Sequence, residues 1–282
     1  MKLWLSCVSS NAIKSMETSV TKNLLMLVLE FPLNIISRLL SKLFDRSPTI
    51  HHSGRKRKLS RVQKDILSKE VDFYQKLNPY YQTYFEHRVA NFIRTYEFIG
   101  RDGYEINAET KVLLGASYTM LTFGKRKYIT DVFDKIIIYP DIFLSTVTKK
   151  KHKGEFNPKL KIVVFSWKHF KEGNLIKSDN LNLGIHEFTH IVHIKSMKRN
   201  DDSSLVFKKE YNNLIQYLQN NKAVREKIIS SNYFRTYAFT NQYEFIAVLV
   251  ENFIETPQEF KLKFPRIYRK IKRMLNFNFL HY

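Results

Sequence analysis

The chain has a single cysteine, Cys7, among its 282 residues. An intrachain disulfide needs two cysteines, so the disulfide framework that stabilises many small secreted domains is excluded. This scarcity suits a reducing compartment, and we therefore expect a cytoplasmic protein.

Long hydrophobic runs are also missing. The best candidate, residues 24–29, is followed by Glu30 and Pro32, whereas a membrane-spanning helix needs about 20 largely apolar residues. Residues 1–7 are too short for the apolar region of about 7–15 residues in a secretory signal peptide. The sequence therefore predicts neither a spanning helix nor a signal peptide, and it contains no internal repeat.

Acidic residues are scarce relative to basic ones. There are 26 Asp and Glu against 47 Lys and Arg, which gives a formal net charge of +21. Much of the excess lies in residues 55–58, 149–153 and 261–273. One interpretation of this positive charge is a solvated, lysine-rich surface, and the other is that the protein binds an anionic partner. No nucleic-acid-binding motif is present, so we predict no specific nucleic acid partner.

The N-terminal part differs from the rest. Residues 33–46 have the pattern of an amphipathic helix, with apolar and polar side chains on opposite faces. Such a helix either packs on the following domain or lies on an anionic membrane surface, which would place the protein at the inner membrane face. A basic, turn-forming run follows, typical of a linker. We therefore divide the chain into an N-terminal segment, 1–58, and a domain, 59–282.

The most informative motif lies at residues 186–190, which read His-Glu-Phe-Thr-His within a segment of helical periodicity. Two histidines four residues apart project from one face of a helix, where they can bind a single Zn²⁺. The glutamate between them, Glu187, then lies beside the open position of the metal. H-E-x-x-H is the signature of zinc peptidases.

A catalytic zinc site usually has three protein ligands and a water, so this motif requires a third ligand. The version with a third histidine is excluded, because it needs Gly at 193 and His at 196, where the chain has His193 and Ser196. Another source is a glutamate on a later helix. An amphipathic helix predicted to begin near Asn241 offers two on the same face, Glu244 and Glu251.

The periodicity of the domain predicts a mostly helical α+β structure. We expect strands at 135–139 and 161–166 and helices at 60–76, 79–95, 107–122, 179–197, 205–219, 241–254 and 265–275. The strand at 161–166 just precedes the motif helix. It either lends a free edge to a substrate backbone, as a strand in this place does in zincins, or is an ordinary buried strand.

The segment around Glu244 resembles a known family. Residues 237–248 read Tyr-Ala-Phe-Thr-Asn-Gln-Tyr-Glu-Phe-Ile-Ala-Val, similar to Y-A-x-T-[DN]-x-x-E-x-F-A-V in the Mlc titration factor A (MtfA) family of zinc peptidases. They also resemble a segment of the catalytic domain of anthrax lethal factor. Further segments resemble the family in the same order, at 136–143, 163–167, 251–257 and 264–268. The resemblance extends over most of the chain.

The resemblance implies a zincin-like metallopeptidase fold, α+β and mostly helical, with a small mixed sheet next to the H-E-x-x-H helix. It implies one Zn²⁺ per chain, held by His186, His190 and Glu244. It makes Glu187 the general base for a zinc-activated water and Tyr237 the group that stabilises the oxyanion. The substrate would be a peptide or protein, cleaved by aminopeptidase or endopeptidase action.

The same resemblance carries an alternative, because the MtfA family is associated with binding a transcriptional repressor. The chain would then be a regulatory scaffold that sequesters a transcriptional regulator, with weak or no peptidase activity. The presence of all five catalytic positions favours the enzyme. One departure from the family is His193, where the family tends to have Asp. We interpret His193 as a buried or supporting residue rather than a fourth ligand.

Overall fold

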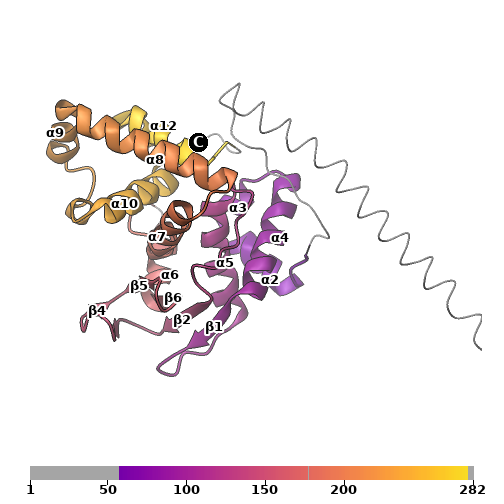
Figure 1. Ribbon diagram of the computed structural model, residues 1–282. Coiled ribbons are helices and arrows are strands. Elements are labelled where there is room, and N and C mark those ends of the chain that lie inside the picture. Colours follow the sequence, from indigo (N-terminus) through magenta and orange to yellow (C-terminus); the bar gives the residue numbers. More distant parts are fainter. Residues whose placement is uncertain (1–56, 177, 279–282) are drawn as a thin grey trace, which may run out of the picture. The chain divides into compact units, whose positions relative to one another are not determined.

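The computed structural model describes residues 57–176 and 178–278, whose arrangement Figure 1 shows. The helix predicted at 33–46 lies outside these residues and stays a prediction. None of the described helices has the length and apolar character needed to cross a bilayer.

The described chain contains both helices and short strands up to Ser166, and only helices follow. In chain order they are α2 (Arg61–Glu70), α3 (Asp72–Gln75), α4 (Pro79–Thr95), β1 (Glu97–Gly100), α5 (Ala108–Thr122), β2 (Lys135–Tyr139), β3 (Phe143–Leu144), β4 (Lys151–His152), β5 (Gly154–Asn157), β6 (Ile162–Ser166), α6 (Trp167–Leu175), α7 (Leu183–Lys198), α8 (Asp202–Asn220), α9 (Lys222–Ser230), the 3₁₀ helix η1 (Thr236–Phe239), α10 (Gln242–Glu255), α11 (Pro257–Lys263) and α12 (Pro265–Met274).

Four of the strands form one mixed sheet in the order β1-β2-β6-β5. Strands β1, β2 and β6 are parallel, and β5 runs antiparallel to β6 at the end of the sheet. Strand β2 buries alternate residues, Ile136 and Ile138, as expected for a strand with one face in the core. Strands β3 and β4 form a separate two-stranded hairpin. The predicted α+β fold, mostly helical with a small mixed sheet, is confirmed.

Helix α7 carries the H-E-x-x-H motif and lies between the sheet and the C-terminal helices (Figure 1). Its N-terminus is capped by Asn182, whose side-chain oxygen accepts a hydrogen bond of 3.0 Å from the Ile185 amide. On its buried face, the Phe188 ring lies 5.3 Å from that of Tyr118 and 5.2 Å from that of Phe165. These contacts with α5 and β6 fix the orientation of the motif.

The helices predicted within the described residues all occur, with differences at their ends. The helix expected at 60–76 is divided into α2 and α3, because Val71 has an extended backbone (φ −119°, ψ 91°). The helix expected from residue 179 begins at Leu183, after its Asn182 cap. Elements that the sequence analysis missed are too short to show a clear period: β1, β3, β4, β5, α6, α9, η1 and α11.

The strand expected at 161–166 is present as β6, but it has no free edge. Its Val163 pairs with Ile136 of β2 on one side and with Phe156 of β5 on the other. The hypothesis that this strand offers an edge to a substrate is therefore wrong, and the alternative of a buried strand is correct. The terminal strand of the sheet next to α7 is β5.

Candidate metal centre

Two helices bring three ligand-type side chains together. His186 and His190 project from α7, and Glu244 projects from the first turn of α10. The Nε2 atom of His186 lies 2.9 Å from Oε2 of Glu244 and 3.2 Å from Nε2 of His190. His190 Nε2 lies 3.5 Å from the same glutamate oxygen. The three atoms therefore form a compact triangle.

This triangle has the dimensions of a zinc site. Ligand atoms about 2.0–2.1 Å from a tetrahedral zinc ion lie about 3.3 Å apart. Oε2 of Glu244 is buried, and it faces the Nε2 atoms of both imidazoles. A cation at the centre would satisfy this oxygen and both facing imidazole nitrogens. Within the described residues, this is the one group of three or more His, Cys, Asp or Glu side chains with converging ligand atoms.

The charges around the triangle favour a cation as well. Burial lowers the pKa of His186, but contacts with Glu244 and Glu251 outweigh burial and raise this pKa to about 10. Burial raises the pKa of Glu244, but contacts with His186 and His190 hold it well below its usual range. The cluster therefore stabilises positive charge at the place where the ligand atoms converge.

Glu251, the other candidate ligand, lies behind His186. Its Oε1 atom is 2.6 Å from Nδ1 of His186, on the side of the ring away from the triangle. Arg235 donates two hydrogen bonds of 2.7 Å to the Glu251 carboxylate, and the backbone N–H of Asn182 donates one of 3.2 Å. A carboxylate that accepts from Nδ1–H leaves Nε2 free for a metal ion. Glu251 therefore occupies a supporting position.

Arg235 is not among the site residues predicted from the sequence. It directly precedes η1, two residues before Tyr237. The sequence indicates it only indirectly, because a fully buried carboxylate such as Glu251 requires a cationic partner. Linear spacing does not identify that partner, since Arg235 and Glu251 meet only after α10 has packed against η1.

Glu187 faces the terminal strand of the sheet. Burial raises the pKa of this carboxyl, and the opposing effect of His186 and His190 is smaller. Strand β5 passes directly over it, because a Cβ atom at Gly154 would lie 2.7 Å from Oε1 of Glu187 and 2.7 Å from Leu183. A Cβ atom here would require the side chains of Glu187 and Leu183 to move, and glycine avoids this. Strand β5 thus forms a wall beside the carboxylate.

Tyr237 lies on η1 at the edge of the site. Its ring centroid is 5.9 Å from that of His186, and half of the residue is exposed. Burial, with Glu244 and Glu187 nearby, raises the pKa of Tyr237 to about 12. Its hydroxyl is therefore protonated near neutral pH and available as a hydrogen-bond donor.

His193 lies in the core, away from the triangle. Its ring is 4.7 Å from that of Tyr243, 4.8 Å from Tyr211 and 5.4 Å from Phe207, measured between centroids. It is buried, its Nδ1 atom has no hydrogen-bond partner among the described residues, and burial lowers its pKa to about 4. His193 is not one of the converging ligand atoms, in agreement with its interpretation as a buried residue.

Acidification should destabilise the fold through His193. Its pKa is about 4 in the folded protein, whereas an unperturbed histidine has a pKa of about 6.5. The unfolded chain therefore takes up the proton first, and stability is lost as the pH falls from about 6.5 towards 4. His193→Gln should remove this contribution, at most about 3 kcal/mol. Urea unfolding of chelator-treated proteins across this range measures it, and parallel curves for both proteins would contradict it.

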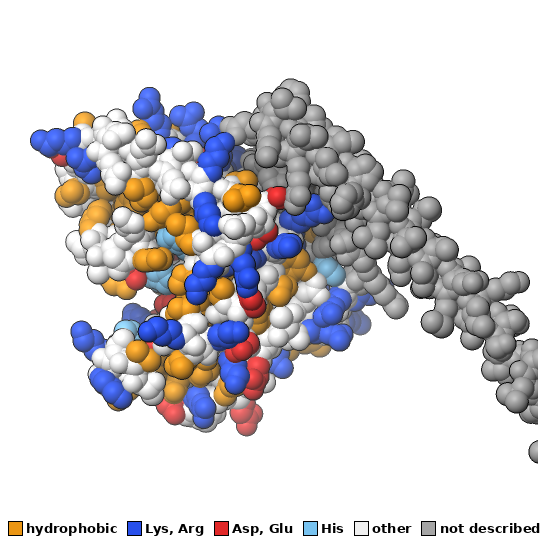
Figure 2. Space-filling model, viewed as in Figure 1, with side chains coloured by type: hydrophobic (Ala, Val, Ile, Leu, Met, Phe, Trp, Pro, Cys, Tyr) orange, Lys and Arg blue, Asp and Glu red, His pale blue; other side chains and the backbone are white. Residues whose placement is uncertain are grey.

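His186 of the triangle lines a cavity of about 590 Å³, together with Glu187. One wall comes from β4 and the start of β5, another from α6 and the loop before α7, and η1 contributes Tyr237. Figure 2 shows a hollow on this face, with histidine side chains inside it and Lys or Arg side chains along its rim. The site is therefore accessible to a ligand larger than a metal ion.

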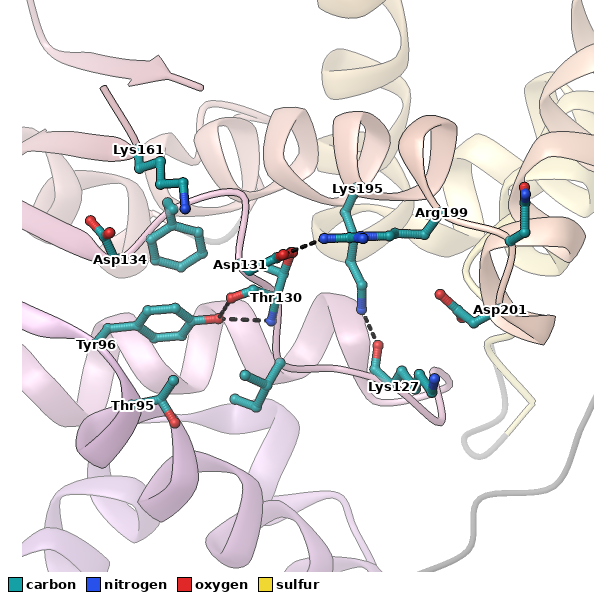
Figure 3. A pocket seen from close by; sticks show the side chains of 13 residues that line it. Thr95, Tyr96, Lys127, Thr130, Asp131, Asp134, Lys161, Lys195, Arg199 and Asp201 are labelled. Carbon is teal, nitrogen blue, oxygen red and sulfur yellow. Dashed lines mark hydrogen bonds and ion pairs between the residues drawn. The ribbon is translucent and has the colours of Figure 1, made fainter. Parts of the chain in front are cut away.

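A second cavity, of about 690 Å³, lies at the other end of α7 (Figure 3). Its principal cations already have partners, since Arg199 pairs with Asp131 and Lys195 donates to the backbone oxygen of Lys127. It has no histidine in its lining and no converging ligand atoms. These contacts tie α7 to the loop before β2, and we assign the cavity no metal.

Comparison with known proteins agrees with this geometry. The family model described as glucose-regulated metallo-peptidase M90 matches residues 48–275. An uncharacterized protein of Synechocystis sp. (strain PCC 6803) is 25% identical over 232 residues, covering 74% of this chain and 81% of that protein. The family match includes the whole candidate site.

Proposed function

The chain belongs to the glucose-regulated metallo-peptidase M90 family, and we propose that it hydrolyses peptide bonds with one zinc ion held by His186, His190 and Glu244. Membership confirms the resemblance to the MtfA family and the zincin-like α+β fold. A metallopeptidase family implies a metal cofactor and a peptide substrate. The catalytic domain that we propose comprises residues 59–282.

The observation that carries the proposal is the triangle of ligand atoms, with a buried glutamate oxygen that faces two imidazole nitrogens. Two imidazoles and a carboxylate are a common ligand set of catalytic zinc. The supporting bond from Glu251 to His186 is of the kind that orients zinc ligands in proteins. A regulatory scaffold has no need of Glu187, and its position against β5 therefore favours the enzyme over that alternative.

A zinc ion in this site would act as a Lewis acid and lower the pKa of a bound water to about 7. Glu187 would accept the proton from the attacking water and later donate it to the leaving amine. The Tyr237 hydroxyl would donate a hydrogen bond to the carbonyl oxygen as negative charge develops on it. Glu251 and Arg235 would hold the ring of His186 in place.

Metal analysis and cleavage assays on the purified full-length chain test this function. We expect about one zinc per chain and cleavage of a peptide substrate, lost with a chelator and restored by zinc. An unstructured protein and aminoacyl nitroanilides, assayed together, separate endopeptidase from aminopeptidase action. A zinc-loaded chain that cleaves none of them, while binding a transcriptional regulator, would favour the scaffold.

Gly154→Ala should lower kcat with little loss of zinc. The added Cβ must displace either β5 or Glu187, since it would lie 2.7 Å from Oε1 of that carboxylate. A catalytic group misplaced by about 1 Å can cost about 100-fold in rate. Gly115→Ala in α5 is the control, because its Cβ would meet the Phe92 ring at 3.1 Å, away from the site. Equal kcat for Gly154→Ala and the wild type would contradict the proposed role of this contact.

Tyr237→Phe should lower kcat by about 10²- to 10³-fold, the range expected for loss of one oxyanion donor. Zinc content and KM should change little, since the hydroxyl acts mainly in the transition state. If the hydroxyl serves packing instead, Phe would lower the melting temperature and spare kcat. Measuring kcat, zinc content and melting temperature on one preparation separates the two.

A further inference from the structure

One wall of the metal cleft carries unpaired positive charge. Lys151 of β4 and Lys153, just before β5, line the cavity that contains His186 and Glu187. Both lysines are exposed, and neither forms an ion pair within the described part of the chain. They flank His152, which pairs with Phe143 in the hairpin, and both lysines line the same cavity.

The other charges of the cleft are arranged differently. The cation opposite the hairpin, Arg235, is neutralised by its two hydrogen bonds to Glu251. The wall formed by α6 and the following loop carries Glu172 and Asp179. The cleft therefore has one basic side, at the hairpin. A carboxylate of a bound ligand would meet two lysines there that have no ion-pair partner among the described residues.

The basic wall continues directly into the terminal strand. Lys153 adjoins Gly154, the first residue of β5 and the residue that lies against Glu187. An extended peptide that pairs with β5 would therefore run past the lysines on its way across the site. Alternate side chains of such a peptide lie on one face, about 6.6 Å apart.

We propose that this cleft selects peptides with acidic side chains, which Lys151 and Lys153 bind on the hairpin side of the scissile bond. The inference rests on the proposed peptidase function and names its substrate class. Both lysines would act on binding rather than on chemistry, because an ion pair with a substrate side chain is equally strong in the ground state and the transition state. Acidic residues should therefore lower KM and leave kcat nearly unchanged.

The test uses zinc-loaded full-length protein and fluorogenic peptides that are identical except for Glu, Gln or Lys at each position near the scissile bond. At one or two positions, Glu should give about tenfold higher kcat/KM than Gln, with Lys lowest. The preference should shrink as salt is raised, because the lysines are exposed. Lys151→Gln/Lys153→Gln should reduce the preference to about twofold or less.

A matched control removes the same charge elsewhere. Lys222→Gln/Lys261→Gln changes two lysines of α9 and α11, which do not line the cleft, and should keep the wild-type preference. Equal rates for Glu and Gln peptides in the wild type would overturn the proposal. The proposal would also be overturned if the preference for Glu survives in Lys151→Gln/Lys153→Gln, or if both double variants lose it equally.

Failure of the peptidase function is distinguishable from failure of this inference. If the zinc-loaded wild type cleaves no peptide of any charge, the proposed function fails. Binding of the same Glu and Gln peptides, labelled and titrated with zinc-loaded Glu187→Gln protein by fluorescence anisotropy, then decides the charge question. Tighter binding of the Glu peptide that requires Lys151 and Lys153 would support the inference, and equal binding would overturn it.

Discussion

Replacing Glu187 with Gln is expected to lower peptide hydrolysis by about 10²- to 10⁴-fold, the contribution typical of a positioned general base. The amide keeps the shape of the side chain beside Gly154 but cannot accept the proton of the attacking water. Zinc content should be unchanged, because Glu187 is not one of the three converging ligand groups. Steady-state kinetics and metal analysis on the same protein measure both quantities.

Glu172→Gln is a matched control for this experiment. Glu172 also lines the cleft, and its carboxylate lies 3.9 Å from His169, outside the triangle. It should retain most of the wild-type kcat. Wild-type hydrolysis by zinc-replete Glu187→Gln protein would show that another group, or none, takes the proton, and the proposed mechanism would fail.

Glu244→Ala is expected to remove most of the bound zinc, because it deletes a ligand and leaves two imidazoles. Glu251→Gln should have a smaller effect, about 10- to 100-fold in affinity, as is usual for a group that orients a ligand. Glu251 is also buried against Arg235, so the Gln variant should lose stability that Glu244→Ala keeps. Competition with a chromogenic chelator measures affinity, and thermal unfolding of the metal-free proteins measures stability.

Two outcomes would contradict this assignment. Equal zinc affinity in Glu244→Ala and the wild type would reduce Glu244 to a charge near the N-terminus of α10, which contributes under about 1 kcal/mol. A loss of zinc confined to the Glu251 variant would show that Glu251 is the ligand. Zinc titrations of both variants against the wild type distinguish these cases.

The sequence was sufficient for the part of the site that lies on one helix. The spacing of His186 and His190 determines their common face whatever surrounds α7. Glu244 and Glu251 are two turns apart on α10 and share a face, so periodicity alone left both open. Their roles differ because α10 crosses α7 with its first turn at the open side of His186 and its third turn behind the ring.

The terminal strand shows why other parts of the fold were missed. The four residues of β5 read Gly-Glu-Phe-Asn, and neither Gly nor Asn favours a strand. Its partner β6 reads Ile-Val-Val-Phe-Ser, which is strongly typical of a strand. For this reason β6, and not β5, was predicted as the edge strand beside the site. Which strand ends a sheet depends on the partners available in three dimensions, and Gly154 belongs there because of its contact with Glu187.

The three proposed ligand side chains come from two separate helices, so a bound metal ion would be a cross-link between them. His190 and Glu244 are separated by a segment that includes all of α8 and α9. Closing a loop of about 54 residues in an unfolded chain costs about 3–4 kcal/mol of entropy. An ion that bridges α7 and α10 would therefore clamp the C-terminal helices to the motif helix, and its loss would loosen the whole second half of the domain.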